Sequence, residues 1–136
     1  IPKGACVLVY NCSFEKSVIQ DLAKQFPDCS NHLMSIHDNV IDLMIPFQKK
    51  HYYKKEMKGR YSIKAVLPAL IRDSSYSKMG INEGMEASNH YKNLSSIASL
   101  VEKDKIKEDL KVYCKQDTQS MIDVLEFLKT VVLRSR

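Results

Sequence analysis

The sequence predicts an α/β domain with more helix than strand. Two short apolar segments rich in strand-forming residues lie in the first third of the 136-residue chain, and a helical pattern separates them. The strongest helical pattern ends the chain. The sequence contains no internal repeat, low-complexity tract or domain linker, so residues 1–136 are expected to form a single domain.

Two strands and one helix are expected in the first part of the chain. Residues 5–11, ACVLVYN, form an apolar run long enough for a strand that is buried on both faces. A helical pattern follows over about 13–26 and stops at Pro27, and a second strand pattern covers 39–46, NVIDLMIP. A strand, a helix and a strand in this order indicate a βαβ unit with a parallel pair of strands.

The remainder is expected to be helical apart from two irregular segments. Residues 48–64 have the pattern of a long loop or arm, and residues 74–84 are rich in turn-forming side chains. The predicted helices cover 61–71, about 85–99 and about 105–133. The first of them is capped by Ser62 and disturbed at Pro68. Since two strands make a poor sheet, further strands are expected before Ile1.

The composition is that of a globular protein without a membrane span. Apolar residues make up 44% and charged residues 27% of the chain, and no signal-peptide pattern opens it. No apolar run approaches the roughly 18 residues that span a bilayer. We therefore expect no membrane partner and a cytoplasmic location. The chain begins Ile1-Pro2-Lys3, which indicates a processed product or a piece of a longer protein.

The cysteines indicate thiols rather than a disulfide framework. They are Cys6, Cys12, Cys29 and Cys114, and none has Cys-x-x-Cys spacing. Because two of them lie within apolar segments, we expect buried thiols in a cytosolic protein. Cys29-x-x-His32, with His37 nearby, has the spacing of half a zinc site, but the sequence contains no second half at zinc-like spacing.

All of the excess positive charge lies in one segment. Residues 48–64, QKKHYYKKEMKGRYSIK, carry seven Lys or Arg and one Glu, whereas the other residues carry 14 basic and 15 acidic side chains. Tyr52, Tyr53 and Tyr61 are interleaved with these cations. The segment is either a solvated lysine-rich loop or a contact surface for a polyanion, with cations on phosphates and aromatic rings available to stack on bases.

Two carboxylates interrupt apolar helix faces. Wound at 3.6 residues per turn, the last helix has an apolar stripe in which Asp117 lies level with Leu110 and Leu128. Glu15 lies within the apolar stripe of the first helix, in a first turn that favours an anion. Because such acids are costly unless compensated, each is either a capped or paired structural acid or a ligand that converges with the other on a cation. Tyr113, on the same face as Asp117, is either its partner in the core or holds a water beside a metal ion.

Three segments together resemble a known enzyme superfamily. VYNCSFEKSVIQDL (9–22) and YCKQD (113–117) resemble the second and third motifs of the DnaQ-like 3′–5′ exonucleases. Those motifs read roughly Asn-x-x-Phe-acid at a strand–helix junction and, in the tyrosine type, Tyr-x-x-x-Asp on the last helix. With HYYKKEMKGRYSIKAVLPAL (51–70), the segments look more closely like the C-terminal predicted exonuclease domain of an uncharacterised bacterial protein family. The resemblance covers nearly the whole chain.

The resemblance implies a ribonuclease H-like three-layer fold and phosphodiester hydrolysis with two divalent ions, Mg²⁺ or Mn²⁺. By matching position, Asp117 and Glu15 would be catalytic metal ligands, and Tyr113 would orient or activate the attacking water. Asn11 and Phe14 would support the turn or contact the nucleic acid. The cations expected to bind a single-stranded DNA or RNA end are Lys54, Lys55, Lys58, Arg60 and Lys64.

Two departures from the superfamily pattern limit what the chain is expected to do. Glu15 stands where the second motif usually has Asp, so the metal spacing could differ. The first motif, Asp-x-Glu on an opening strand, supplies two of the four acids and occurs nowhere in the 136 residues. We therefore expect an N-terminally truncated exonuclease domain that is inactive or nearly so by itself. Asp42 ends the second strand, where the superfamily often has an acid, and we interpret it as structural.

Two other function classes stay open. The chain could be a non-catalytic nucleic-acid-binding module with a degenerate nuclease site, or a protein-interaction domain whose lysine-rich segment contacts an acidic partner. The sequence before Ile1 would discriminate, because an apolar strand with Asp-x-Glu favours the enzyme. An incomplete sheet would also leave an open strand edge through which the fragment could form a homodimer.

Overall fold

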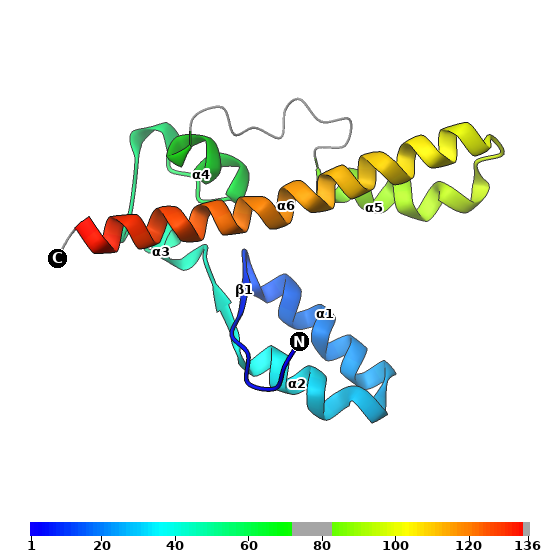
Figure 1. Ribbon diagram of the computed structural model, residues 1–136, viewed down its shortest axis with the longest axis horizontal. Helices are drawn as coiled ribbons and strands as arrows, with labels where there is room; N and C mark the ends of the chain where they lie inside the picture. The colour runs from blue at the N-terminus through cyan, green and yellow to red at the C-terminus, as the bar shows by residue number, and fades with distance from the viewer. Residues whose placement is uncertain (72–82, 135–136) are drawn as a thin grey trace. The chain divides into compact units, whose positions relative to one another are not determined.

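The computed structural model describes residues 1–71 and 83–134 and has a mixed α/β architecture with far more helix than strand (Figure 1). It divides into two compact units, Ile1–Val66 and Leu67–Arg136. The first unit holds a two-stranded sheet, and the described residues of the second are helical or lie in turns. The expected α/β class with an excess of helix is confirmed. The single-domain and ribonuclease H-like expectations stay predictions.

The predicted parallel pair of strands is present in the first unit. β1 (Val7–Val9) pairs with β2 (Val40–Asp42), with Val7 opposite Val40 and Val9 opposite Asp42. One further backbone hydrogen bond, from Leu43 N–H to the carbonyl of Val9 at 2.9 Å, extends the pairing. Both strands are shorter than the apolar runs that predict them, because the chain turns into helix soon after each strand.

The connection between the strands contains two helices rather than one. α1 (Cys12–Gln25) confirms the helix expected over about 13–26, whereas α2 (Ser30–Asp38) lies outside the predicted helices. Pro27 accounts for the difference, because it stands just beyond α1 but also begins a 3₁₀ turn, η1 (Pro27–Cys29), that leads into α2. The fixed φ of proline suits the first position of a helix. The two helices pack against each other as a hairpin (Figure 1).

The segment 48–64 is more ordered than the long loop that its composition predicts. α3 (Ile45–Gln48) ends at Gln48, the first residue of this segment. Pro46 lies in the first turn of α3 rather than closing a strand. A 3₁₀ turn, η2 (Lys55–Met57), lies in its middle, and α4 (Ile63–Leu70) begins near its end.

Apolar and aromatic contacts hold this segment in place. The side chain of Met57 is only 1% exposed. The rings of Phe47 and Tyr52 meet edge to face with centroids 6.3 Å apart. The N–H of Gly59 donates a hydrogen bond to Tyr53 Oη at 3.1 Å. The segment therefore combines buried apolar anchors with its lysines.

The second unit contains a helical hairpin. α5 (Gly84–Asn93) continues into a 3₁₀ turn, η4 (Leu94–Ser96), and the chain reverses into α6 (Leu100–Arg134), which runs back along α5 (Figure 1). The two helices predicted in this region are confirmed. The turn-rich segment 74–84 lies outside the described residues apart from its last two. Neither α6 nor any other helix in the described parts of the chain has the length and apolarity needed to cross a membrane.

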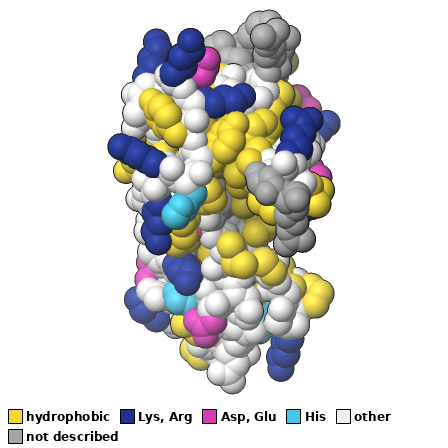
Figure 2. Space-filling model, turned by 90° about the vertical axis from the view of Figure 1, so that its left-hand side faces the viewer, with side chains coloured by type: hydrophobic (Ala, Val, Ile, Leu, Met, Phe, Trp, Pro, Cys, Tyr) yellow, Lys and Arg dark blue, Asp and Glu magenta, His cyan; other side chains and the backbone are white. Residues whose placement is uncertain are grey.

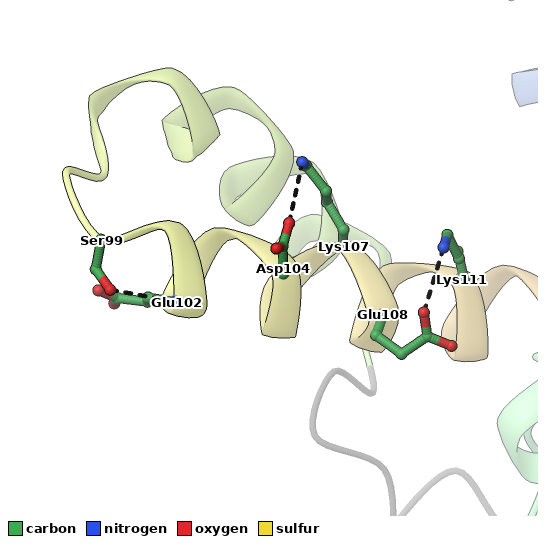
Figure 3. A network of polar contacts seen from close by, with 6 residues as sticks. All are labelled: Ser99, Glu102, Asp104, Lys107, Glu108 and Lys111. Atoms are coloured by element: carbon green, nitrogen blue, oxygen red, sulfur yellow. Dashed lines mark hydrogen bonds and ion pairs between the residues drawn. The ribbon is translucent and has the colours of Figure 1, made fainter.

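Polar contacts explain why α6 begins before its predicted start at about 105. Ser99 Oγ accepts a hydrogen bond from the N–H of Glu102 at 3.3 Å, which caps the helix (Figure 3). Exposed ion pairs follow on the next turns: Lys107 with Asp104 and Lys111 with Glu108, both at 3.3 Å (Figure 3). Each pair contributes only about 0.3–0.5 kcal/mol to the stability of the helix. The pairs and the cap together nevertheless favour a helix over the first turns of α6, where apolar residues do not recur with a clear helical period.

Several large apolar side chains reach the surface (yellow in Figure 2). On α1 and at its end they recur every four residues and form an exposed stripe: Phe14, Val18, Leu22 and Phe26. The fully or nearly buried apolar residues are Val9, Ala23, Leu43, Phe47, Met57, Val66, Leu67 and Val124. The described residues thus bury a small core for a chain of this length.

The expectation of buried thiols is wrong for most of the cysteines. Cys6, Cys29 and Cys114 are exposed, Cys12 is half-buried, and all four are free. Cys6 precedes β1 rather than lying within it, and Cys114 faces outward from α6 beside Tyr113. Apolar neighbours in the sequence therefore did not imply an apolar environment in the fold.

Candidate functional site

An acid from β2 holds the junction between β1 and α1. Asp42 Oδ1 accepts hydrogen bonds from the N–H groups of Asn11 at 3.0 Å and Met44 at 2.8 Å, and Oδ2 accepts one from Cys12 N–H at 2.8 Å. Asn11 and Cys12 are the N-cap and the first residue of α1. A carboxylate from the neighbouring strand therefore caps the helix and faces its positive end, which gives Asp42 a structural role.

Asp42 is charged in the folded protein although it is only 7% exposed. Its burial acts to raise its pKa, but hydrogen bonds from three backbone N–H groups and from the Cys12 thiol outweigh burial and hold the pKa below its ordinary value of 3.8. The pKa of the Cys12 thiol is raised by its own burial and by Asp42. Cys12 therefore stays a neutral thiol despite its place at a helix N-terminus.

Three of the predicted site residues lie on the first turn of α1. Asn11 has a left-handed backbone with φ 77°, and its Oδ1 accepts a hydrogen bond from the Ser13 hydroxyl at 2.9 Å. Among residues other than glycine, asparagine adopts this conformation comparatively easily. Phe14 is 63% exposed, and Glu15 is half-buried in the first turn. The structure thus places Asn11, Phe14 and Glu15 together at the end of β1.

An open cavity of about 530 Å³, here termed the α1 cavity, lies beside this turn. Its lining residues are Tyr10, Asn11, Met44, Gln48, Tyr61, Ser62 and Ile63. Tyr10 Oη donates a hydrogen bond to the carbonyl of Tyr61 at 2.7 Å, which joins two walls. Burial and the charge of Asp42 raise the pKa of Tyr10, so its phenol stays protonated. Tyr10 and Gln48 were not predicted as site residues, because only the fold brings such distant segments together.

The predicted nucleic-acid-binding cations also lie in the first unit. Lys55, Lys58, Arg60 and Lys64 are exposed, and Lys54 is half-buried. Lys58 has a left-handed backbone with φ 49°, which reverses the chain directly after η2. Four of these five cations are therefore exposed to solvent on a segment that Met57 anchors.

In the second unit, Tyr113 and Asp117 form a pair one turn apart on α6. Partial burial of the phenol, the charge of Asp117 and a hydrogen bond with its carboxylate raise the pKa of Tyr113 to about 12. The phenol is therefore protonated near neutral pH and donates to Asp117. Tyr113 Oη also reaches the start of α5, where it lies 3.5 Å from the place a Cβ would occupy at Gly84.

This pair explains how an acid is tolerated in the apolar stripe of α6. Asp117 is half-buried rather than enclosed, and the phenol replaces part of its lost hydration. The stripe otherwise follows the prediction, with Val124 buried and with Leu110 and Leu128 half-buried. A hydrogen bond within the stripe therefore compensates an otherwise costly carboxylate.

The predicted catalytic residues fall into two groups. Glu15 lies in the first unit with Asn11 and Phe14, and Tyr113 lies in the second unit with Asp117. Within residues 1–71 and 83–134, no three His, Cys, Asp or Glu side chains are grouped so that they could hold a metal ion. The described residues therefore do not form a complete metal site, and a shared site for Glu15 and Asp117 stays a prediction.

Comparisons with known proteins relate the chain to a domain family and to an uncharacterised protein. Residues 1–62 match the family described as Domain of unknown function (DUF2779). Over 142 residues the chain is 24% identical to "Uncharacterized protein UU173" of Ureaplasma parvum serovar 3, and the match covers 92% of this chain. The chain spans only 21% of the length of that relative. No solved structure matches the chain.

Proposed function

We propose that the chain is part of a metal-dependent 3′–5′ exonuclease with a ribonuclease H-like fold, acting on single-stranded DNA or RNA ends. The Tyr113–Asp117 pair carries the proposal, because it is a half-buried carboxylate bonded to a phenol one turn away on the last long helix. This arrangement is the one implied by the resemblance to a Tyr-x-x-x-Asp motif.

The end of β1 supports the proposal from the first unit. Ligands of α/β proteins with parallel strands usually bind beyond the carboxyl ends of the strands. Asn11, Phe14 and Glu15 follow β1 directly, and Asp42 fixes the backbone of that turn. The turn thus offers a carboxylate and an exposed aromatic ring at the expected edge of the sheet.

Tyr113 would act in this enzyme as the hydrogen-bond partner of Asp117, which lies one turn away on α6. With a pKa of about 12, its phenol holds its proton near neutral pH. Its single O–H proton is donated to Asp117, so its phenol oxygen would accept a hydrogen bond from the water molecule. The resemblance leaves open whether the tyrosine orients or activates the attacking water.

The chain supplies only part of the ligand set for two divalent ions. Glu15 and Asp117 are the two carboxylates that the resemblance assigns to metal binding, and hard cations such as Mg²⁺ and Mn²⁺ prefer such oxygen ligands. The remaining acids would come from the rest of the parent protein, which we propose is cytoplasmic. When bound, the ions would supply charge for phosphodiester hydrolysis, whereas this chain would position the water and the strand.

The exposed stripe of α1 supports a larger sheet in the parent protein. A helix between parallel strands normally buries its apolar face on the sheet. Phe14, Val18, Leu22 and Phe26 are all at least 37% exposed. Additional strands, supplied by residues outside this chain, would cover Val18, Leu22 and Phe26 and complete the ribonuclease H-like layer, while Phe14 would stay at its edge beside the site.

The test is hydrolysis of labelled single-stranded DNA and RNA by the intact parent protein with Mg²⁺ or Mn²⁺. Asp117→Asn is expected to abolish detectable hydrolysis, because it removes a metal ligand. Tyr113→Phe is expected to lower the rate about 10- to 100-fold, since groups that orient a ligand typically have effects of this size. Both variants should keep the circular dichroism spectrum of the unmodified protein.

Asp123→Asn is the matched control on α6. Asp123 is a half-buried acid that accepts a hydrogen bond from Gln119 at 2.9 Å on the polar face. Its substitution should leave the rate unchanged. Equal rates for Asp117→Asn and the unmodified parent would refute the exonuclease proposal.

A non-catalytic nucleic-acid-binding module is the second candidate. The exposed cations of residues 48–64 favour it, because they supply the charge that binds phosphates without any need for a metal site. In that case the intact parent would bind single strands and would not hydrolyse them with either ion.

A further inference from the structure

The α1 cavity has the size and lining of a small-ligand site. Its volume of about 530 Å³ lies within the roughly 300–1,000 Å³ of typical ligand pockets, whose walls are mainly apolar with a few placed polar groups. Met44 and Ile63 supply apolar walls, and Tyr10 and Tyr61 supply aromatic ones. All of the described residues that line it belong to the first unit.

The polar groups of the cavity suit a flat heteroaromatic ring. Asn11 and Gln48 each carry an amide, which offers a donor and an acceptor side by side. The edges of nucleobases present the same alternation, and their faces stack on tyrosine rings. Because Tyr10 is hydrogen-bonded to the backbone of Tyr61, the aromatic walls are tied to each other before any ligand binds.

The described residues that line the cavity include no cation, but three cations adjoin these residues in the sequence. Lys49 and Lys50 directly follow the lining residue Gln48, and Arg60 directly precedes the lining segment 61–63. All three are exposed, and none has an ion-pair partner among the residues that the structure describes. A ligand with a neutral planar ring and an anionic group would match uncharged lining residues that have cations next to them in the sequence.

We infer that the α1 cavity binds a single nucleotide, with the base against Tyr61 and the phosphate at the cationic rim. This inference deepens the proposed function, because the bound nucleotide would be the terminal residue of the nucleic-acid strand. It rests on the proposed function only for that source of the nucleotide. A free mononucleotide has the same chemistry. The cavity would thus determine how the strand end is held, and Gln48 and Asn11 would affect which base is preferred.

The test is calorimetric titration of the chain with adenosine monophosphate, adenosine and inorganic phosphate, each without a divalent metal. The monophosphate should bind more tightly than either of its parts. Tyr61→Ala should weaken binding of the monophosphate about tenfold, since base–aromatic contacts have effects of this order. Arg60→Gln should weaken the monophosphate but leave adenosine unchanged, because only the phosphate reaches the rim.

The variants are chosen so that a loss of binding is not a loss of fold. In Tyr61→Ala the acceptor for Tyr10 is preserved, because it is a backbone carbonyl. Arg60 is exposed and has no ion pair to lose among the described residues. Tyr91→Ala, at a tyrosine that is 74% exposed on α5, and Arg134→Gln, at the end of α6, are matched controls and should bind like the unmodified chain.

Three results would overturn the inference. The first is no binding of the monophosphate, and the second is equal binding by the unmodified chain and Tyr61→Ala. The third is full competition by inorganic phosphate with no affinity for adenosine. A single-stranded oligonucleotide that fails to compete with the monophosphate would contradict the strand end as the source. The titrations contain no divalent metal and measure binding alone, so they do not depend on hydrolysis. A parent protein that does not hydrolyse nucleic acid would therefore refute the exonuclease proposal and leave the nucleotide-binding inference standing.

Discussion

Asp42 determines the geometry of the turn that carries Asn11, Phe14 and Glu15. Its two carboxylate oxygens fix the first backbone N–H groups of α1 across 30 and 31 residues of sequence. The cost of burying its charge is offset by these hydrogen bonds, which are stronger than bonds between neutral groups. At the scale of single residues, one acid therefore both caps a helix and positions the candidate site.

Asp42→Asn is expected to destabilise the chain by about 1–3 kcal/mol. The backbone N–H groups that donate to Asp42 would lose a charged acceptor, and at least one of them would face the NH₂ group of asparagine, which is itself a donor. Urea unfolding near neutral pH measures the change in the free energy of unfolding. Asp28→Asn, at an exposed acid in η1, is the control and should change it little. A free energy of unfolding unchanged in Asp42→Asn would contradict the capping role.

The free energy of unfolding should also depend on pH in a different way in Asp42→Asn than in the unmodified chain. Since the folded pKa of Asp42 lies below its ordinary value of 3.8, its contribution to stability is present above that value and is lost as the pH falls through the lower folded pKa. The difference in stability between the unmodified chain and Asp42→Asn should therefore narrow on acidification. A constant difference across that range would argue against a charged Asp42.

At the scale of elements, apolar runs and the helical period of the sequence predicted several helices and strands directly. β1, β2, α1 and α6 belong to this group. α2 was missed because it follows a proline and begins with polar residues, Ser30, Asn31 and His32, that also suit a loop. The extent of α6 was underestimated, since its first turns depend on a cap and on ion pairs rather than on an apolar face.

The candidate site was predictable only where its signal is local. Asp117 and Glu15 stood out because a charge in an apolar stripe violates the helical period, and Tyr113 shares a face with Asp117. The contact of Asp42 with α1 and the α1 cavity join segments 30 or more residues apart, so no periodic pattern reveals them. Long-range contacts of this kind depend on the fold as a whole.

The basic segment is expected to bind nucleic acid through its charges. For a single strand, log K falls with log salt concentration by about 0.7 per phosphate contact. Replacing the two exposed cations Lys55 and Lys58 by Gln should therefore reduce the slope by about 1.4. Fluorescence anisotropy with a labelled oligonucleotide at several salt concentrations gives the slope.

Lys92→Gln with Lys105→Gln is the matched control, because both lysines are exposed on the helices of the second unit. Its slope should equal that of the unmodified chain. If the Lys55 and Lys58 substitutions left the slope unchanged, residues 48–64 would not follow the phosphates, and a solvated loop would be the better interpretation.

At the scale of the whole molecule, each of the two units carries part of the proposed site. The first offers Glu15 on a turn fixed by Asp42, and the second offers Asp117 paired with Tyr113. The two acids are separated by about 100 residues of sequence, yet the proposed function requires them to serve the same ions. This requirement is the central claim, and it concerns the parent protein that supplies the remaining acids.

The most direct test is a double-mutant cycle on manganese binding by the intact parent protein. Electron paramagnetic resonance would give the Mn²⁺ affinity of the unmodified protein, Glu15→Gln, Asp117→Asn and the double variant. We expect each single substitution to weaken the same site and the two effects to be coupled by at least about 0.5 kcal/mol, as for residues that share a partner. Affinities that do not change, or effects that simply add, would contradict a shared metal site.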